Sequence, residues 1–277
     1  MSDLSAAAIL AALDRARSIV GRPLTVMAVT ASTNDDARAA AAIGAPHGAA
    51  FVADAQTSGR GRGGHTWHSP SGENLYLSMI ARPAVPASAV APVALAVGVA
   101  IARVVEARLG GRATVWIKWP NDVLAIAGDP EAGEPAVLSA RKLAGVLVEG
   151  QLRGAEVAGL IIGAGLNVRA RSFPPEIAAR ATSLALLGAL DHDLDRSVIA
   201  AEILAGIGGA VARFEEDRLE SFLPDLHRLD ALRGARVEVG GARGVAERID
   251  ESGCLEVRGE GGRVQRVSTG EVRLLGG

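Results

Sequence analysis

Residues 48–81 read GAAFVADAQTSGRGRGGHTWHSPSGENLYLSMIA, two apolar segments around a loop rich in glycine and arginine. Residues 48–55 form a continuous apolar run and residues 73–81 alternate, and both patterns are typical of strands. The loop satisfies the G-x-G-x-x-G pattern of dinucleotide-binding folds, which requires a helix directly after it. Pro70 and Gly72 interrupt that position, so the stretch predicts strand, loop and strand.

The rest of the sequence argues against two other interpretations of this loop. A phosphate-binding P-loop is excluded because the chain contains no Gly-Lys-Ser or Gly-Lys-Thr sequence. An RGG-type nucleic-acid segment needs repeated units in a low-complexity tract, and here a single copy lies between two strands. On the loop alone, an exposed segment with incidental arginines remains open.

Composition limits the class of protein. The 277 residues are 49% hydrophobic but only 3% aromatic, which predicts a core of aliphatic side chains. A net charge of −2 argues against a protein that binds nucleic acid electrostatically over its whole surface. Cys254 is the single cysteine, so an internal disulfide and a cysteine-rich zinc site are excluded, and a cytoplasmic location is expected.

Two apolar segments resemble export or membrane signals. At the N-terminus, Asp3 stands where a signal peptide has positive charge, so we expect an amphipathic helix capped by Ser2 or Asp3. The 20 uncharged residues between Arg82 and Arg103 are long enough to cross a bilayer, but prolines interrupt their first half. We therefore predict a buried core helix from about Pro86 to residue 109 and no membrane association.

The remaining pattern predicts an α+β chain. We expect a strand at 24–32 and a helix from 32 to about 43, two short strands around a turn at 113–125, and adjacent strands at 142–152 and 155–168. A polar loop at 127–141 is expected to be mobile, and a helical stretch covers about 174–230, with its clearest helix at 195–214. Short strands separated by Gly-Gly and Ser-Gly follow from Ala235 and predict a small β-domain. The predicted domains are 1–232 and 233–277.

Five stretches occur together and in one order: STN (32–34), QTSGRGRGGHTWHSPSGENLYLSM (56–79), KWPNDVL (118–124), KLAGVLVE (142–149) and IIGAGLNV (161–168). In this combination the chain resembles the biotin protein ligase family, the biotin–[acetyl-CoA-carboxylase] ligases. The resemblance implies a class II synthetase-like mixed β-sheet with a small C-terminal SH3-like β-barrel. It implies formation of biotinyl-5′-AMP from biotin and ATP with Mg²⁺, and transfer of biotin to a lysine of a biotin carboxyl carrier protein domain.

The resemblance also implies site residues. Polar groups for the ureido ring and cations for two crowded anions are what this chemistry requires. The implied biotin-binding positions are Ser32, Thr33, Asn34, Gln56, Gly59, Arg60, Gly61, Arg62, Lys142, Gly145, Gly163 and Gly165. The implied catalytic positions are Arg60, Arg62, Lys142 and Asp122. The implied ATP-binding positions are Arg62, Trp67, Lys118, Asn121 and Asn167.

Several of these residues have structural alternatives that the sequence leaves open. Ser32 or Thr33 could cap the following helix, Lys142 could be a solvated lysine, and Gly163 could mark a strand bulge. Asp122 could orient a lysine or help to hold Mg²⁺. Structural roles are expected for Trp116 and Trp119.

The resemblance leaves rival functions to be tested. A lipoate or octanoate ligase shares the synthetase-like core, and a non-catalytic biotin sensor would share the binding groups. Family members that repress transcription carry an N-terminal winged helix-turn-helix, and the roughly 23 residues before the first strand here are too few for one. No nucleic-acid binding is therefore expected.

Overall fold

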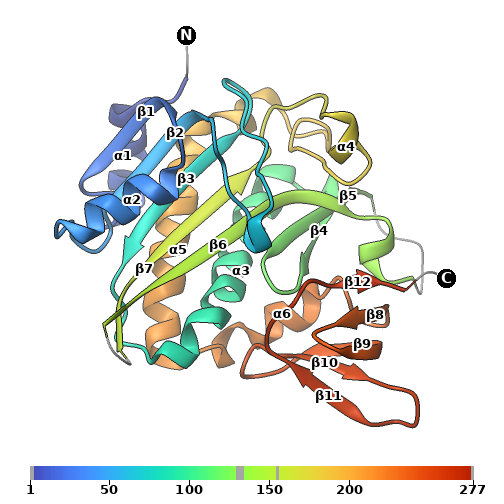
Figure 1. Ribbon diagram of the computed structural model, residues 1–277. Helices are drawn as coiled ribbons and strands as arrows, with labels where there is room; N and C mark the ends of the chain where they lie inside the picture. The colour runs from blue at the N-terminus through green and yellow to red at the C-terminus, as the bar shows by residue number, and fades with distance from the viewer. Residues whose placement is uncertain (1–2, 129–133, 154–155, 276–277) are drawn as a thin grey trace.

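The computed structural model describes residues 3–128, 134–153 and 156–275. A seven-stranded mixed sheet forms its centre, in the spatial order β1-β2-β3-β7-β6-β5-β4 (Figure 1). Its strands are β1 (Leu24–Thr30), β2 (Ala50–Gln56), β3 (Leu75–Ala81), β4 (Ala113–Lys118), β5 (Asp122–Ala127), β6 (Arg141–Arg153) and β7 (Glu156–Leu166). Only β1 and β2 run parallel among these neighbours, and the predicted mixed sheet is thus confirmed.

Helices cover both faces of the sheet unequally. The helices α1 (Ala6–Arg15), α3 (Val90–Leu109) and α5 (Arg196–Asp217) pack together on one face, and α2 (Thr33–Ala42) lies on the other (Figure 1). The first group shares the main hydrophobic core, whereas α2 packs its alanines on a small separate cluster with Ile80 and Ile161. The α2 side therefore leaves part of the sheet free of helices, and the glycine-rich loop lies there.

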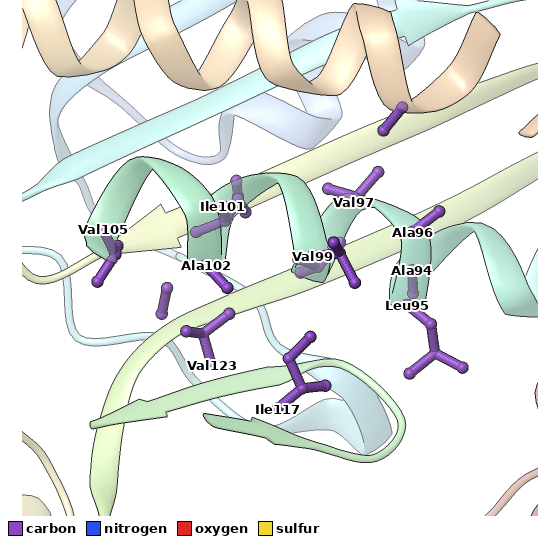
Figure 2. Close-up of a cluster of buried hydrophobic side chains, with 14 of the residues drawn as sticks. Ala94, Leu95, Ala96, Val97, Val99, Ile101, Ala102, Val105, Ile117 and Val123 are labelled. Atoms are coloured by element: carbon purple, nitrogen blue, oxygen red, sulfur yellow. The ribbon is translucent and has the colours of Figure 1, made fainter. Parts of the chain in front are cut away.

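The long apolar segment is a core helix, as predicted. Helix α3 is preceded by a 3-10 turn at Ala87–Ala89 and ends at Gly110, which adopts a left-handed conformation. Its small aliphatic residues pack against Ile117 and Val123 of the β4–β5 hairpin (Figure 2). By length and composition α3 and α5 could each cross a membrane, but 56% of each apolar window is buried inside the fold.

The expected start of the first helix is wrong. Helix α1 begins at Ala6, and the Ser5 hydroxyl accepts the cap hydrogen bond from the amide of Ala8. Asp3 instead pairs with Arg196 and Arg169, and the bond and charge of Arg196 lower the pKa of Asp3 although burial opposes this. Ser2 lies outside the described residues. The N-terminal segment is thus attached to α5 by an ion pair, which propensity alone could not show.

The predicted helical stretch at 174–230 is partly correct. It contains α4 (Pro175–Ala178), α5 and α6 (Leu223–Leu229), but residues 179–190 form turns and extended chain. Asp195 caps α5 by accepting hydrogen bonds from the amides of Ser197 and Val198. Within the predicted loop at 127–141, residues 129–133 lie outside the described part of the chain, and Ala136–Leu138 form a 3-10 turn.

The C-terminal strands form a second, antiparallel sheet in the order β11-β10-β9-β8-β12. They are β8 (Arg236–Val239), β9 (Ala242–Ile249), β10 (Leu255–Arg258), β11 (Val264–Val267) and β12 (Arg273–Leu274). Trp119, 1% exposed, donates its indole N–H to the carbonyl of Gly253 at 2.9 Å and so fixes this sheet to the β4–β5 turn. The hydrophobic core is continuous across residue 233, where the division into two domains remains a proposal.

The loop that follows β2 returns to the sheet as a strand. β2 and β3 are antiparallel neighbours, and between them the chain crosses in front of β6 and β7 (Figure 1). A 3-10 turn at Arg62–Gly64 is its only helical segment, and every residue of this loop is described. The predicted strand, loop and strand are confirmed, and the dinucleotide-binding arrangement is excluded.

Candidate functional site

The register of four strands builds a smooth floor on the α2 face of the sheet. Tyr76 lies opposite Gly165, Gly165 opposite Gly145, and Gly145 opposite Asp122, which makes one row across β3, β7, β6 and β5. Ser78, Gly163 and Leu147 form a second row beside it. Directly opposed residues project to the same face. Three glycines therefore leave the centre of this floor without side chains.

A small hollow of about 50 Å³ lies between this floor, the start of α2 and the glycine-rich loop. We call it the recess. Its lining consists of Ser32, Thr33, Asn34, Gln56, Arg60, Gly61, Arg62, Trp67, Tyr76, Leu77, Asn121, Lys142, Gly145, Val146, Leu147, Gly163, Ala164 and Gly165. Polar groups, cations and small apolar side chains thus meet in one place, as a small-molecule site requires.

Two side chains already occupy the space above the glycines. A Cβ at Gly163 would lie 2.1 Å from Oδ1 of Asn34, and a Cβ at Gly165 would lie 2.5 Å from Cε2 of Trp67. Trp67 also lies over Gly145, where a Cβ would approach its Cζ3 to 3.1 Å. Each glycine is therefore needed for a close side-chain contact in this conformation. The predicted contacts of the glycines with a ligand stay a proposal.

The polar cluster at the start of α2 is buried and satisfied within the protein. The amide of Thr33 donates to Oε1 of Gln56 at 3.0 Å, and Nε2 of Gln56 donates to Oγ of Ser69 at 3.0 Å. Ser78 Oγ lies 2.8 Å from Oγ1 of Thr33 and 2.6 Å from Oδ1 of Asn34. Ser32 stands at the N-cap of α2, but its side chain makes no cap hydrogen bond. Helix capping by the Ser32 side chain therefore does not explain why polar residues gather here.

The glycine-rich loop is a small hairpin folded over the floor. The amide of Gly61 donates to the carbonyl of His65 at 2.7 Å, and the amide of Trp67 donates to the carbonyl of Gly59 at 2.8 Å. Its turn places Gly63 and Gly64 at φ of 64° and 80°, a region that favours glycine. The hairpin delivers Trp67 and both arginines to the recess.

The two loop arginines have different partners. Nη2 of Arg60 pairs with Asp35 at 2.7 Å and with Glu149 at 3.3 Å. Nη2 of Arg62 donates to Oγ1 of Thr269 at 3.4 Å. The second contact joins the recess to the C-terminal sheet, as does the approach of His65 Nε2 to Glu271 at 3.6 Å. The C-terminal sheet therefore supports the loop directly.

Lys142 reaches the recess through an irregularity of β6. The register between β5 and β6 shifts after Val123, so that Ala144 and Lys142 face consecutive residues of β5. Such a bulge redirects side chains and brings Lys142 beside Gly145. Its Nζ lies 2.8 Å from Oδ1 of Asp122 and 5.1 Å from the centre of the Trp67 ring. Asp122 thus orients a lysine here, which is one of its two predicted roles.

Four predicted site residues lie outside the lining of the recess: Gly59, Lys118, Asp122 and Asn167. Gly59 supports the loop, because a Cβ there would lie 2.6 Å from Oγ of Ser69. The side-chain amide of Asn167 donates to the carbonyl of Thr182 at 2.9 Å and so positions the chain beside Lys142. Lys118 lies opposite Asp122 at the end of the first floor row. A ligand contact by these four residues stays a prediction.

The sequence missed several residues that shape the site. Ser78 is 0% exposed and contacts Thr33 and Asn34, and Glu149 contacts Asn34 and Arg60. Tyr76 donates its hydroxyl to the carbonyl of Pro70 at 3.0 Å, and burial raises its pKa, so the phenol stays protonated. Within the strand patterns these residues had no distinguishing signal. Tyr76 and Ser78 are two residues apart on β3, and this spacing could have indicated that they share a face.

Comparison with known proteins shows the family of this chain. The family model described as "Biotin/lipoate A/B protein ligase family" matches residues 26–167, which include most of β1, all of β2 to β7, and the lining of the recess. This chain belongs to that family. The matched segment ends beside Asn167, before α4 and the C-terminal sheet.

Named relatives extend the similarity of this family member beyond the matched segment. A biotin–[acetyl-CoA-carboxylase] ligase of Mycobacterium tuberculosis is 36% identical over 91% of this chain and 88% of its own. The bifunctional ligase/repressor BirA of Escherichia coli is 32% identical over 77% of this chain. The chain spans 63% of that relative and 53% of the corresponding protein of Bacillus spizizenii.

A solved structure of the family has the same architecture. The biotin protein ligase from Aquifex aeolicus, in complex with biotin and ATP, superposes with a TM-score of 0.69 at 26% identity. The similarity covers 90% of this chain and 97% of that one. The fold of the mixed sheet and the C-terminal antiparallel sheet is therefore shared with a biotin protein ligase of known structure.

Proposed function

We propose that this protein activates biotin with ATP to biotinyl-5′-AMP and transfers the biotinyl group to a lysine of a biotin carboxyl carrier protein domain. The observation that carries the proposal is the recess, where a buried amide and hydroxyl cluster meets three cations above a floor of glycines. A cyclic urea needs directional donors and acceptors, and a carboxylate beside a phosphate needs positive charge. Membership of the family and its named biotin ligases support the assignment.

The reaction consists of two displacements. A carboxylate oxygen of biotin attacks the α-phosphorus of ATP, the bond to the bridging oxygen breaks, and pyrophosphate leaves. The carrier lysine amine then attacks the acyl carbon, an amide forms, and AMP leaves with one carboxylate oxygen while the amine loses a proton. Both transition states concentrate negative charge on oxygen, so fixed positive donors lower their free energy.

We assign roles to the residues by their position. Ser32, Thr33, Asn34 and Gln56 bind the ureido end beside Gly163. Arg60, Arg62 and Lys142 bind the carboxylate and α-phosphate, with Asp122 orienting the lysine. Trp67 and Asn121 contact the nucleotide, and Gly59, Gly61, Gly145 and Gly165 allow the loop and ligands to approach the sheet. Closure of the hairpin over the adenylate excludes water from it.

Mg²⁺ accompanies ATP in this proposal. Among the described residues no group of three His, Cys, Asp or Glu side chains could hold a metal ion. Mg²⁺ commonly uses one or two carboxylates together with substrate phosphates and water. Asp122, beside Lys142 at the edge of the recess, fits as one such ligand, and the metal would neutralise the leaving pyrophosphate.

The partner and location follow from the reaction. The carrier domain presents its lysine to the open side of the recess, and we propose that this occurs in the cytoplasm, in agreement with the single cysteine of the chain.

Lys118 and Asn167 lie outside the recess lining, and we propose that they support the binding of ATP.

The test is pyrophosphate exchange into ATP with biotin, lipoate or octanoate supplied singly. We expect exchange with biotin, followed by modification of a carrier-domain lysine when the carrier is added. Exchange that depends on lipoate or octanoate and is silent with biotin would overturn the assignment. Biotin binding that leaves the carrier lysine unmodified would instead indicate a sensor.

A further inference from the structure

Glu149 lies next to the recess without lining it. It is on β6, two residues beyond Leu147 and four beyond Gly145, so its side chain projects to the same face as the floor. Its side chain is 27% exposed. The position is close enough to the site to act on binding residues and open enough to tolerate substitution.

One carboxylate oxygen of Glu149 is shared by two site residues. Oε2 accepts a hydrogen bond from Nδ2 of Asn34 at 2.7 Å and another from Nη2 of Arg60 at 3.3 Å. The other oxygen, Oε1, pairs with Nη2 of Arg38 at 2.7 Å. Asn34 belongs to the buried polar cluster and Arg60 to the exposed hairpin. Glu149 therefore joins these two parts of the site through a single atom.

The carboxylate determines which way the Asn34 amide faces. An ionised carboxylate only accepts hydrogen bonds, so it selects the NH₂ side of the amide. The Oδ1 side then faces Oγ of Ser78 at 2.6 Å and the glycine floor at Gly163. The Ser78 hydroxyl can donate or accept and would fit either orientation, so Glu149 is the described contact of Asn34 that selects one of them.

The same carboxylate helps to hold the hairpin. Arg60 is 39% exposed and is bound by Asp35 and Glu149 only through Nη2. Exposed ion pairs are weak individually, but two carboxylates on one guanidinium fix its place better than either alone. Loss of Glu149 should therefore loosen the hairpin as well as the amide.

We infer that Glu149 is a positioning residue that couples recognition at Asn34 to the position of Arg60 in the hairpin. This inference rests on the proposed function for its ligand, biotin. Because one oxygen serves both contacts, loss of this side chain disturbs both. The charge of Glu149 is needed for Arg60, whereas an acceptor oxygen alone is sufficient for Asn34.

Three variants separate these roles: Glu149→Ala, Glu149→Gln and Asp35→Asn. Steady-state pyrophosphate exchange gives KM for biotin and kcat, and trypsin cleavage of the ligand-free protein after Arg60 and Arg62 reports hairpin order. Glu149→Ala should raise KM for biotin about tenfold, change kcat less and speed cleavage, because both bonds are lost. Glu149→Gln should keep KM within about twofold but speed cleavage, and Asp35→Asn should affect cleavage alone.

Two controls complete the design. Arg38→Gln removes the third partner of Glu149 and an ion pair of Asp35, but no contact of Asn34, and should leave KM for biotin unchanged. Glu106→Ala removes a carboxylate of similar exposure, 33%, that pairs with Arg228. Equal changes of KM in Glu149→Ala and Arg38→Gln would overturn the inference.

Two further results would overturn it: wild-type KM and cleavage in Glu149→Ala, or an equal rise of KM in Glu149→Gln and Glu149→Ala. The cleavage assay needs no turnover. A wild-type protein without biotin-dependent exchange would therefore defeat the proposed function alone, whereas unchanged cleavage in Glu149→Ala would defeat the inference about Glu149 alone.

Discussion

The floor of the recess and the hairpin above it are built in opposite ways. Floor residues such as Ser78 and Tyr76 are 0% and 1% exposed and are held by the register of paired strands. The hairpin carries its arginines on a turn with few contacts, and Arg60 is 39% exposed. Recognition is thus placed on the rigid element and most of the charge on the exposed one. Lys142, a cation fixed to the sheet, links the two.

Loss of the fixed cation should have the largest effect. Lys142→Gln removes a donor held at 2.8 Å from Asp122 and leaves that carboxylate, whose side chain is 19% exposed, without its partner. We expect kcat of biotin-dependent exchange to fall by about 10²–10³-fold, as for other preorganised donors. Arg103→Gln, which breaks the exposed ion pair of α3 with Asp225 on the opposite face of the sheet, is the control and should cost little. Equal losses in the two variants would show that the sheet cation has no special role.

A methyl group on the floor should disturb recognition next. Gly163→Ala places a Cβ where Oδ1 of Asn34 lies 2.1 Å away, so the amide must move. Overpacking of about 1–3 kcal/mol corresponds to a rise of roughly 5–160-fold in KM for biotin, with a smaller change in kcat. Calorimetric titration with biotin gives an independent check. Gly209→Ala, on α5 with nothing within 4 Å of the new Cβ, should bind normally, and normal binding by Gly163→Ala would exclude the close contact.

A substitution in the hairpin should affect retention of the adenylate, whereas a substitution on the floor should affect binding of biotin. Arg62→Gly leaves the floor intact, so adenylate still forms, but we expect about tenfold faster release of it and labelling of unrelated lysines. The thermal midpoint should not change, because Arg62 makes one long hydrogen bond. Arg62→Lys keeps the charge without the planar fork and should retain more adenylate. Weaker ATP binding with no released adenylate would contradict a retention role.

The smallest effect is expected where the C-terminal sheet meets the hairpin. Thr269→Val removes the hydroxyl that Arg62 contacts at 3.4 Å and keeps the shape of the side chain. A change of no more than about twofold in adenylate release is expected, because an exposed hydrogen bond of this length contributes little. Stopped-flow or trap experiments can measure it. A large loss of kcat would mean that the C-terminal sheet takes part in catalysis beyond support of the loop.

Local sequence patterns predicted where the helices and strands lie better than they predicted which residues contact each other. Alternation and turn residues located the strands around the hairpin and the helix after Ser32, because period and turn chemistry are local properties. The bulge that turns Lys142 toward Gly145 and the register that sets Ser78 opposite Gly163 are not local. Glu149 was missed for the same reason, and Asp3 was assigned to a cap because its partner Arg196 is 193 residues away.

The central claim is that the carboxylate of biotin is activated by attack on the α-phosphorus of ATP within the recess. Biotin labelled with ¹⁸O in its carboxylate tests this directly, in a single turnover with a carrier domain and mass analysis of the products. The account predicts one labelled oxygen in AMP and none in pyrophosphate. Label in phosphate or pyrophosphate, or unlabelled AMP alongside a biotinylated carrier, would contradict it.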